Sequence, residues 1–221
     1  MRIDILTLFP GMFEGFIHES IIKRAIEKGL VEINLVNIRD FTLLKNGQVD
    51  DTPYGGGSGM VLMCEPVVRA IESVKTDDAK VYLTSPQGVT FTDDVASQIY
   101  HETKHLILVC GHYEGFDERI KNFVDGEISI GDYVLTGGEI PAMAITDCLT
   151  RFIPGVIDEE SFQNESFKDG LLDYPVYTKP REFRGLKVPE VLLSGDHKKI
   201  EEYRHSEQIR VTKEKRPDLL K

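Results

Sequence analysis

Hydrophobic and polar residues alternate along the first 150 positions with two different periods, one typical of strands and one typical of helices. Short apolar runs predict buried strands at residues 2–9, 31–38, 80–85, 105–110 and 128–135. Amphipathic stretches between and after these runs predict helices at residues 12–28, 65–75, 93–103, 117–124 and 141–152. This βα alternation is typical of a mostly parallel sheet with helices on both faces, so we predict an α/β fold.

The periodicity fades after residue 152 and returns in the tail. Residues 153–180 contain three prolines and several acids, which predicts an exposed linker. Residues 188–210 are helical in pattern, and Ser194 or Asp196 is placed to cap the helix that begins near His197. We therefore divide the chain into a main domain at 1–155, a flexible interdomain linker at 156–178 and a helical C-terminal domain at 179–221.

Composition narrows the class of protein. Hydrophobic residues make up 41% of the 221 positions and charged residues 29%, as in a folded, soluble protein. The apolar runs are far shorter than the roughly 20 residues of a membrane helix, and the start resembles no signal peptide, so a cytoplasmic protein is expected. Cys64, Cys110 and Cys148 form no CxxC pair, which indicates neither a disulfide framework nor a metal site. Cys110 is either a buried packing residue or a nucleophile.

The charge is distributed unevenly. The net charge of -11 argues against nucleic-acid binding by the chain as a whole. Residues 1–178 carry 14 Lys and Arg against 29 Asp and Glu, whereas residues 179–221 carry 12 against 8. The tail therefore either binds nucleic-acid phosphates or is an ordinary helical segment with Lys and Arg on its solvent-exposed face.

Glycines gather in loops that follow the predicted strands. These loops are PYGGGSGM at 53–60, SPQG at 85–88, CGHYEG at 110–115 and IGDYVLTGGE at 130–139. The carboxyl ends of parallel strands form a ligand crevice, and glycine lets the backbone approach a ligand closely, so several such loops predict one shared pocket. None of them ends in the GK[ST] of a P-loop or has the GxGxxG of a dinucleotide fold, which excludes a phosphate-rich cofactor.

Several blocks of sequence, in order and spacing, resemble the bacterial tRNA (guanine-N1)-methyltransferase family. They are VDDTPYGGGSGM, YLTSPQG, LILVCGHYEGFDER, SIGDYVLTGGEIPAM, RFIPGV, GLLDYPVYTKP and VPEVLLSGDHKKI. The match runs from Met1 to about Leu220. The resemblance implies a deep trefoil knot of the SPOUT class in the α/β domain, a small helical C-terminal domain, and a homodimer whose active site is shared between subunits. It also implies S-adenosyl-L-methionine as methyl donor, tRNA as partner, and transfer to N1 of guanine 37, 3′ of the anticodon.

The resemblance also implies a set of S-adenosylmethionine-binding residues. They are Leu83, Ser85, Pro86, Gln87, Gly88, Gly111, Tyr113, Glu114, Gly115, Ser129, Ile130, Gly131, Tyr133, Val134, Leu135, Gly137, Gly138 and Pro141. Backbone amides and carbonyls of this set suit an adenine edge, and its apolar members suit packing. The sequence does not decide whether magnesium is required.

Two groups are needed for methylation at guanine N1, because the N1 proton must leave and negative charge develops on the neighbouring carbonyl oxygen. The cation of the family matches Arg151. The base of the family is an aspartate in an Asp-Ser-Phe block, which reads Glu165-Ser166-Phe167 here. Glutamate has the same charge but is one methylene longer, and Asp169 is an alternative base. The structural alternatives to these catalytic roles are that Arg151 only interacts with the carboxyl end of its helix, and that Glu165 and Asp169 are solvated acids of the linker.

Two other functions are compatible with these residues. One is an RNA methyltransferase of the same knotted class that acts on a ribose oxygen or another base. The other is an RNA-binding or regulatory protein that holds S-adenosylmethionine without turnover. Arg151 and a linker carboxylate argue against the second, because a binding protein needs neither a base nor an oxyanion partner.

Overall fold

The computed structural model describes residues 1–159, 162 and 165–220. The chain forms two compact units, Met1–Ile157 and Asp158–Lys221. None of the helices in the described part of the chain is both long and apolar enough to cross a membrane.

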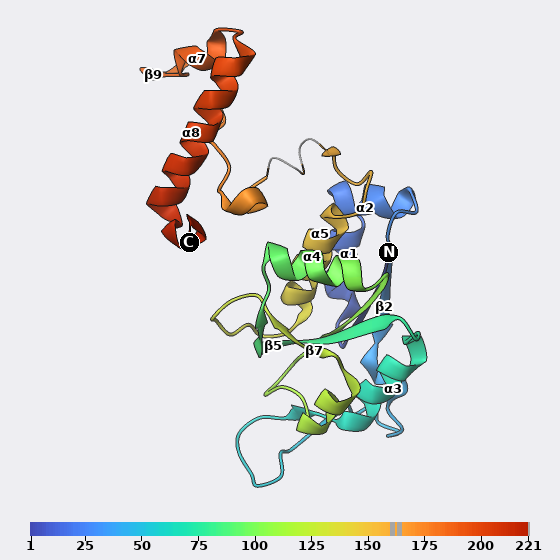
Figure 1. The fold of residues 1–221 in the computed structure, drawn as a ribbon. Helices are drawn as coiled ribbons and strands as arrows, with labels where there is room; N and C mark the ends of the chain where they lie inside the picture. The colour runs from blue at the N-terminus through green and yellow to red at the C-terminus, as the bar shows by residue number, and fades with distance from the viewer. Residues whose placement is uncertain (160–161, 163–164, 221) are drawn as a thin grey trace. The chain divides into compact units, whose positions relative to one another are not determined.

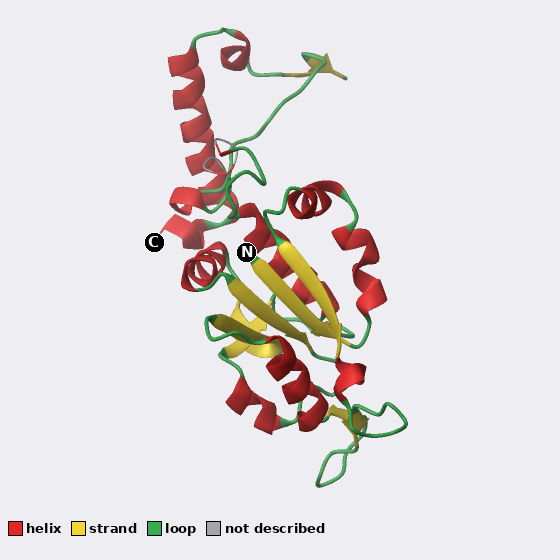
Figure 2. Ribbon diagram, turned by 90° about the vertical axis from the view of Figure 1, so that its right-hand side faces the viewer, coloured by secondary structure: helices red, strands yellow, loops and turns green. Residues whose placement is uncertain are grey.

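The first unit is built on a five-stranded parallel sheet (Figures 1 and 2). Its strands, in spatial order, are β2 (Glu32–Asn37), β1 (Arg2–Thr7), β6 (His105–Cys110), β5 (Ala79–Thr90) and β7 (Gly126–Ser129). A two-stranded antiparallel ladder, β3 (Asp50–Asp51) with β4 (Val61–Leu62), lies outside the sheet. The predicted α/β class with a parallel sheet is confirmed.

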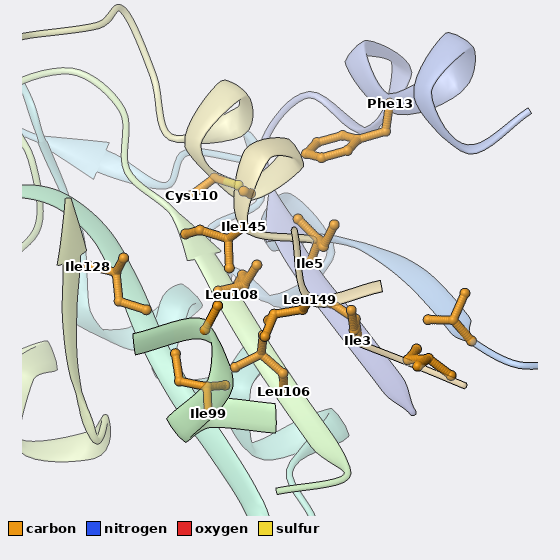
Figure 3. Close-up of a cluster of buried hydrophobic side chains, with 14 of the residues drawn as sticks. Ile3, Ile5, Phe13, Ile99, Leu106, Leu108, Cys110, Ile128, Ile145 and Leu149 are labelled. Carbon is orange, nitrogen blue, oxygen red and sulfur yellow. The ribbon is translucent and has the colours of Figure 1, made fainter. Parts of the chain in front are cut away.

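One face of the sheet packs against the 3-10 helix η1 (Pro10–Phe13) and the helices α1 (Glu14–Ile17), α2 (Ser20–Glu27), α4 (Asp93–Glu102) and α5 (Glu139–Arg151). Leu106 and Leu108 of β6 point into this layer and meet Ile145 and Leu149 of α5 (Figure 3). All four side chains have no exposed surface. Burial of such apolar side chains is the main stabilising contribution to the unit.

The opposite face packs against α3 (Cys64–Val74), η2 (Ile38–Phe41) and η3 (Glu118–Phe123). Ile107 and Val109 of β6 point into this second layer, as the alternation of side chains along a strand requires. Because β6 is buried on both faces, its sequence is a continuous apolar run with no polar alternation. The strands that hold the candidate loops are therefore fixed from both sides.

Several predicted elements differ from the structure, among them the strand expected at 80–85, which extends to Thr90. The helix expected at 12–28 is divided into η1, α1 and α2, because Ser20, the first residue of α2, adopts a left-handed φ of 54°. The strand expected at 128–135 ends at Ser129, and residues 130–138 form a loop. Gly131 has a φ of 150° in that loop, which directs the backbone away from the sheet. The helix expected at 117–124 is the 3-10 helix η3.

The second unit contains the short strands β8 (Glu182–Phe183) and β9 (Leu186–Lys187) and the helices α7 (Glu190–Leu193) and α8 (His197–Lys215). Asp196 caps α8 as predicted, since its side chain accepts a hydrogen bond from Lys199 N at 3.3 Å. The segment that precedes β8 belongs to this unit, because Leu172 N donates to Thr212 Oγ1 of α8 at 2.9 Å.

Candidate active site

A cavity of about 340 Å³ lies at the carboxyl ends of β6 and β7, beside the irregular second half of β5. Its walls come mainly from three segments that are far apart in the sequence, residues 84–87, 111–116 and 127–138, with Glu118 and Lys121 of η3 and Pro141 at the start of α5. The volume lies within the usual range for small-molecule sites, roughly 300–1,000 Å³. The position is the ligand crevice expected for a parallel sheet.

Hydrogen bonds between loops hold these segments together. Gly111 N donates to Thr84 Oγ1 at 3.2 Å, which ties the end of β6 to the middle of β5. Gly138 N donates to Gly111 O at 2.7 Å, which ties the loop before α5 to the end of β6. A side chain at Gly138 would overlap with Thr84 Oγ1, Gly111 N and Cys110 Cα. Glycine is therefore required at 138 by close approach of three segments, although its φ of -84° suits any residue.

The loop after β6 has an unusual backbone. Tyr113 has a φ of 59° and Gly115 a φ of 114°, so the chain turns sharply on both sides of Glu114. Glu114 N donates to Met60 O at 3.0 Å, and Leu62 N donates to Gly115 O at 2.9 Å. The glycine-rich segment 53–60 thus supports the Glu114 loop from behind, and it does not line the cavity as its glycines had suggested.

Acidic side chains dominate the ionisable part of the lining. Glu114, Glu118 and Glu127 line the cavity, and Lys121 is the single lysine or arginine among the lining residues that the structure describes. Lys121 Nζ contacts Glu118 Oε2 at 3.0 Å and Glu127 Oε2 at 3.2 Å, and hydrogen bonds to these carboxylates raise the pKa of Lys121. It also donates to Gln87 Oε1 at 3.3 Å. The lining therefore favours a cationic ligand over a phosphate.

Comparison with known proteins identifies the family of the chain. The family model described as tRNA (Guanine-1)-methyltransferase TrmD matches residues 1–221. The chain belongs to this family. Relatives named tRNA (guanine-N(1)-)-methyltransferase include one from Mycoplasma capricolum, 53% identical over 220 residues, with 100% of this chain and 92% of the relative covered. Others come from Staphylococcus epidermidis, 54% identical over 223 residues (100% and 91% covered), and Dictyoglomus turgidum, 54% identical over 221 residues (100% and 90% covered).

The cavity of this tRNA methyltransferase brings together almost all of the residues predicted to bind the methyl donor. Leu83 and Gly88 are the two that do not line it. Leu83 is fully buried in the layer beneath α3, where its side chain packs in the core. Gly88 has no room for a side chain because the backbone of Glu127 and Ile128 lies directly against it. Both residues therefore shape the neighbouring strands without facing the cavity.

The cavity also has lining residues that sequence reasoning missed. They are Thr84, His112, Phe116, Glu118, Lys121, Glu127, Ile128 and Thr136. His112 is the most informative, because its Nδ1 is buried and has no hydrogen-bond partner among the described residues. Its ring lies 4.8 Å from that of Phe9 and 4.8 Å from that of Tyr113, measured between centroids. A histidine inside the CGHYEG loop was the available signal for this position.

The candidate catalytic residues lie in different units. Arg151 is the last residue of α5 in the first unit and is half-buried. Glu165 is half-buried in the second unit, at the start of a tight loop in which Phe167 and Asp169 both have left-handed φ values, 74° and 54°. Asp173 N donates to Ser166 Oγ at 3.0 Å and Phe167 N to Leu171 O at 2.7 Å, which fixes this loop. The alternative base, Asp169, is exposed.

Cys110 ends β6 beneath the cavity. Its side chain is buried, and burial raises the pKa of the thiol well above its ordinary value. A thiol in this state is a poor nucleophile. Of the two interpretations of Cys110, the structure supports the packing residue.

Proposed function

We propose that the cavity binds S-adenosylmethionine and that the enzyme transfers its methyl group to N1 of guanine 37 in tRNA. Membership of the tRNA (guanine-1)-methyltransferase family identifies the reaction class, the methyl donor and the tRNA substrate. The single observation that supports this location is the convergence of three segments, residues 84–87, 111–116 and 127–138, on one cavity. They include most of the residues that the family resemblance assigns to the donor.

The residues present fit this donor. S-adenosylmethionine combines a neutral adenosine with a sulfonium and an amino acid, and it carries one net positive charge. Gly111, Gly131 and Gly137 present no side chain to the lining, so a ligand can approach the backbone closely there, and Val134 and Leu135 supply apolar walls. The excess of glutamates over Lys121 suits the positive charge. His112 Nδ1, which has no hydrogen-bond partner in the part of the chain that the structure describes, supplies a further polar group.

The bound donor supplies an electrophilic methyl group, and the protein must make guanine N1 nucleophilic. We assign Glu165 as the base that accepts the N1 proton and Arg151 as the cation that stabilises the negative charge on the guanine carbonyl oxygen. The tight loop after Glu165 supports this role, because non-glycine residues with left-handed φ values persist where structure constrains them, often at functional sites.

Arg151 does not reach the cavity of its own chain. The cavity meets α5 at Pro141, and Arg151 follows ten residues later, about 15 Å further along the helix axis. This distance exceeds the reach of an arginine side chain. We therefore infer that the cation at each cavity comes from a second copy of the chain, so that the enzyme works as a homodimer with shared active sites.

Subunit complementation tests the shared site. Leu135→Arg should block the cavity of its own chain, and Arg151→Ala should remove the cation, so each variant alone should be inactive. Mixing the two should restore about a quarter of wild-type activity, because about half of the dimers are mixed and each of these has one intact site. If the mixture stays inactive although mixed dimers form, Arg151 acts within its own chain.

We propose that the basic tail, residues 179–221, binds tRNA. Because the substrate is tRNA, we also expect the enzyme in the cytoplasm. Charge reversal at Lys179, Arg181, Arg184, Lys198 and Lys199 should weaken tRNA binding and leave donor affinity unchanged. Each lost phosphate contact should lower the slope of log affinity against log salt by roughly 0.7–0.9. An unchanged slope would indicate that tRNA binds instead at the loop around Arg39 and Lys45.

The close packing at Gly138 also supports the trefoil knot that the family resemblance implies. The chain lies there against Thr84 of β5 and against Cys110 and Gly111 at the end of β6, with no space for a side chain, and then continues as α5 over the sheet.

The decisive experiment for the function is methyl transfer from labelled S-adenosylmethionine to tRNA transcripts with and without guanine at position 37, followed by mapping of the modified base. Methylation at N1 of that guanine, and none in its absence, is expected. Methylation of a ribose oxygen or another base would favour the first alternative function. Donor binding without turnover would favour the second.

A further inference from the structure

The strands β8 and β9 form a small hairpin in the second unit (Figure 2). Arg184 and Gly185 make its turn, with φ values of 51° and 83°. Positive φ at both central residues is the geometry of a type I′ turn, which matches the twist of a two-residue hairpin. Val188 N donates to Arg181 O at 2.9 Å and closes the ladder. The hairpin is therefore a defined structure, although residues 176–187 are all exposed.

The two faces of this hairpin differ in character. Phe183 pairs with Leu186 and Glu182 pairs with Lys187, and directly opposed residues share a face. Lys187 Nζ lies 3.8 Å from Glu182 Oε2, so this face carries an ion pair. The other face exposes Phe183 by 59% and Leu186 by 75%. Exposed apolar side chains add little to the stability of an isolated hairpin. They are typical of an interaction surface.

The charge around the apolar face indicates what binds to it. Residues 179–187 contain four cations, Lys179, Arg181, Arg184 and Lys187, against one acid, in a chain with a net charge of -11. The guanidinium carbon of Arg184 lies 5.2 Å from the centroid of the Phe183 ring. An exposed aromatic ring with one guanidinium beside it and further cations nearby in the sequence is an arrangement that binds unpaired nucleotides, because the ring stacks on a base and the cations contact phosphates.

We propose that Phe183 stacks on an unpaired base of the tRNA, with the neighbouring cations on the flanking phosphates. The identity of the RNA rests on the proposed function. Phe183 is neither a residue of the cavity lining nor one of the two proposed catalytic residues, and the contact gives the hairpin a role in holding the substrate. Because stacking tolerates any base, this contact adds affinity for a loop nucleotide without selecting its identity.

Tryptophan fluorescence tests the contact directly, since the chain contains no tryptophan. In Phe183→Trp the introduced indole is the sole tryptophan, and titration with tRNA should quench its emission in a saturable way. Phe123→Trp is the matched control, because Phe123 is an exposed phenylalanine of the first unit, 44% exposed, outside the cavity lining. Its emission should not respond to tRNA.

Two further titrations separate the alternatives. A fully paired RNA duplex should leave the emission of Phe183→Trp unchanged, because it offers no unpaired base. Equal quenching by the duplex would overturn the stacking contact. If the emission of Phe183→Trp changes with protein concentration in the absence of RNA, the apolar face contacts a second copy of the chain. If the emission does not change although tRNA is bound and methylated, the proposal is also overturned.

Affinity measurements give an independent result. Phe183→Ala should weaken tRNA binding roughly 5- to 150-fold without changing its salt slope, since base stacking on an aromatic ring carries no counterion release. Phe183→Tyr should restore the affinity because it keeps a ring, and Phe123→Ala should have no effect. Arg184→Gln should lower the salt slope. Donor binding, measured on the same samples by calorimetry, distinguishes loss of this contact from failure of the proposed function.

Discussion

Gly138→Ala is a direct test of the cavity's construction. The added methyl group would overlap with Thr84 Oγ1, Gly111 N and Cys110 Cα. Two of these atoms belong to the backbone, so no side-chain rotation relieves the overlap. Rotation of Thr84 would cost its hydrogen bonds with Val109 O and Gly111 N, both 3.2 Å long. We expect the segment before α5 to move, which also breaks the 2.7 Å bond from Gly138 N to Gly111 O.

The expected cost follows from this geometry. Overpacking a tight site destabilises by about 1–3 kcal/mol, which for a chain of this length lowers Tm by about 2–12 °C. Displacement of the loop should also weaken S-adenosylmethionine binding by about tenfold or more. Urea unfolding measures the first effect and calorimetry the second.

Gly15→Ala is the matched control. Nothing lies within 4 Å of the position its new methyl group would take, and the residue is inside α1 with an ordinary φ. The variant should keep donor affinity and gain up to about 1 kcal/mol from its better helix propensity. If Gly138→Ala has the same free energy of unfolding and the same donor affinity as Gly15→Ala, the close approach of the three segments does not build the cavity.

The remaining predictions concern charge and proton transfer. In single-turnover assays at saturating tRNA, Glu165→Gln should slow methyl transfer by about 10²–10⁴ with donor binding unchanged, and Glu165→Asp should retain clear activity. If Asp169→Asn is inactive and Glu165→Gln is not, the base is Asp169. Arg151→Lys keeps the charge but loses the planar fork, and should lower the transfer rate more than donor affinity, as measured by rate against calorimetry. The Arg119 side chain lowers the pKa of Asp117 through a hydrogen bond. A carboxyl group whose pKa is lower in the folded state stabilises the protein at pH values above its unfolded-state pKa, near 4, and this stabilisation is lost as the pH falls. The free energy of unfolding in urea should therefore decrease less between pH 7 and pH 3 in Asp117→Asn than in the wild type, by about 0.5–1 kcal/mol for this ion pair at the surface.

The strands could be predicted from sequence where burial dictates the residue type. β6 is apolar at every central position because both of its faces are covered, so its run is continuous and its bounds were predicted correctly. The helix at 12–28 was not divided in the prediction, because its break depends on one left-handed residue, Ser20, whose type carries no signal. The end of β7 was missed because the apolar pattern continues into the loop that lines the cavity.

The candidate site was predictable in part for a similar reason. The loops after β5, β6 and β7 could be grouped because parallel strands place their carboxyl ends together. The cluster of Lys121 with Gln87, Glu118 and Glu127 could not, because it joins three separate segments through side-chain contacts that no local pattern records.

The excess of carboxylates in the cavity lining bears on the order of events in turnover. Transfer of the methyl group converts a sulfonium into a neutral thioether, so the spent donor carries one positive charge less than the fresh one. In the proposed donor site, Glu114, Glu118 and Glu127 would attract the fresh donor more strongly than the spent one, and Lys121 would offset only part of this field. Under this proposal the attraction weakens as the reaction proceeds, which would promote exchange of product for substrate and make that exchange sensitive to ionic strength.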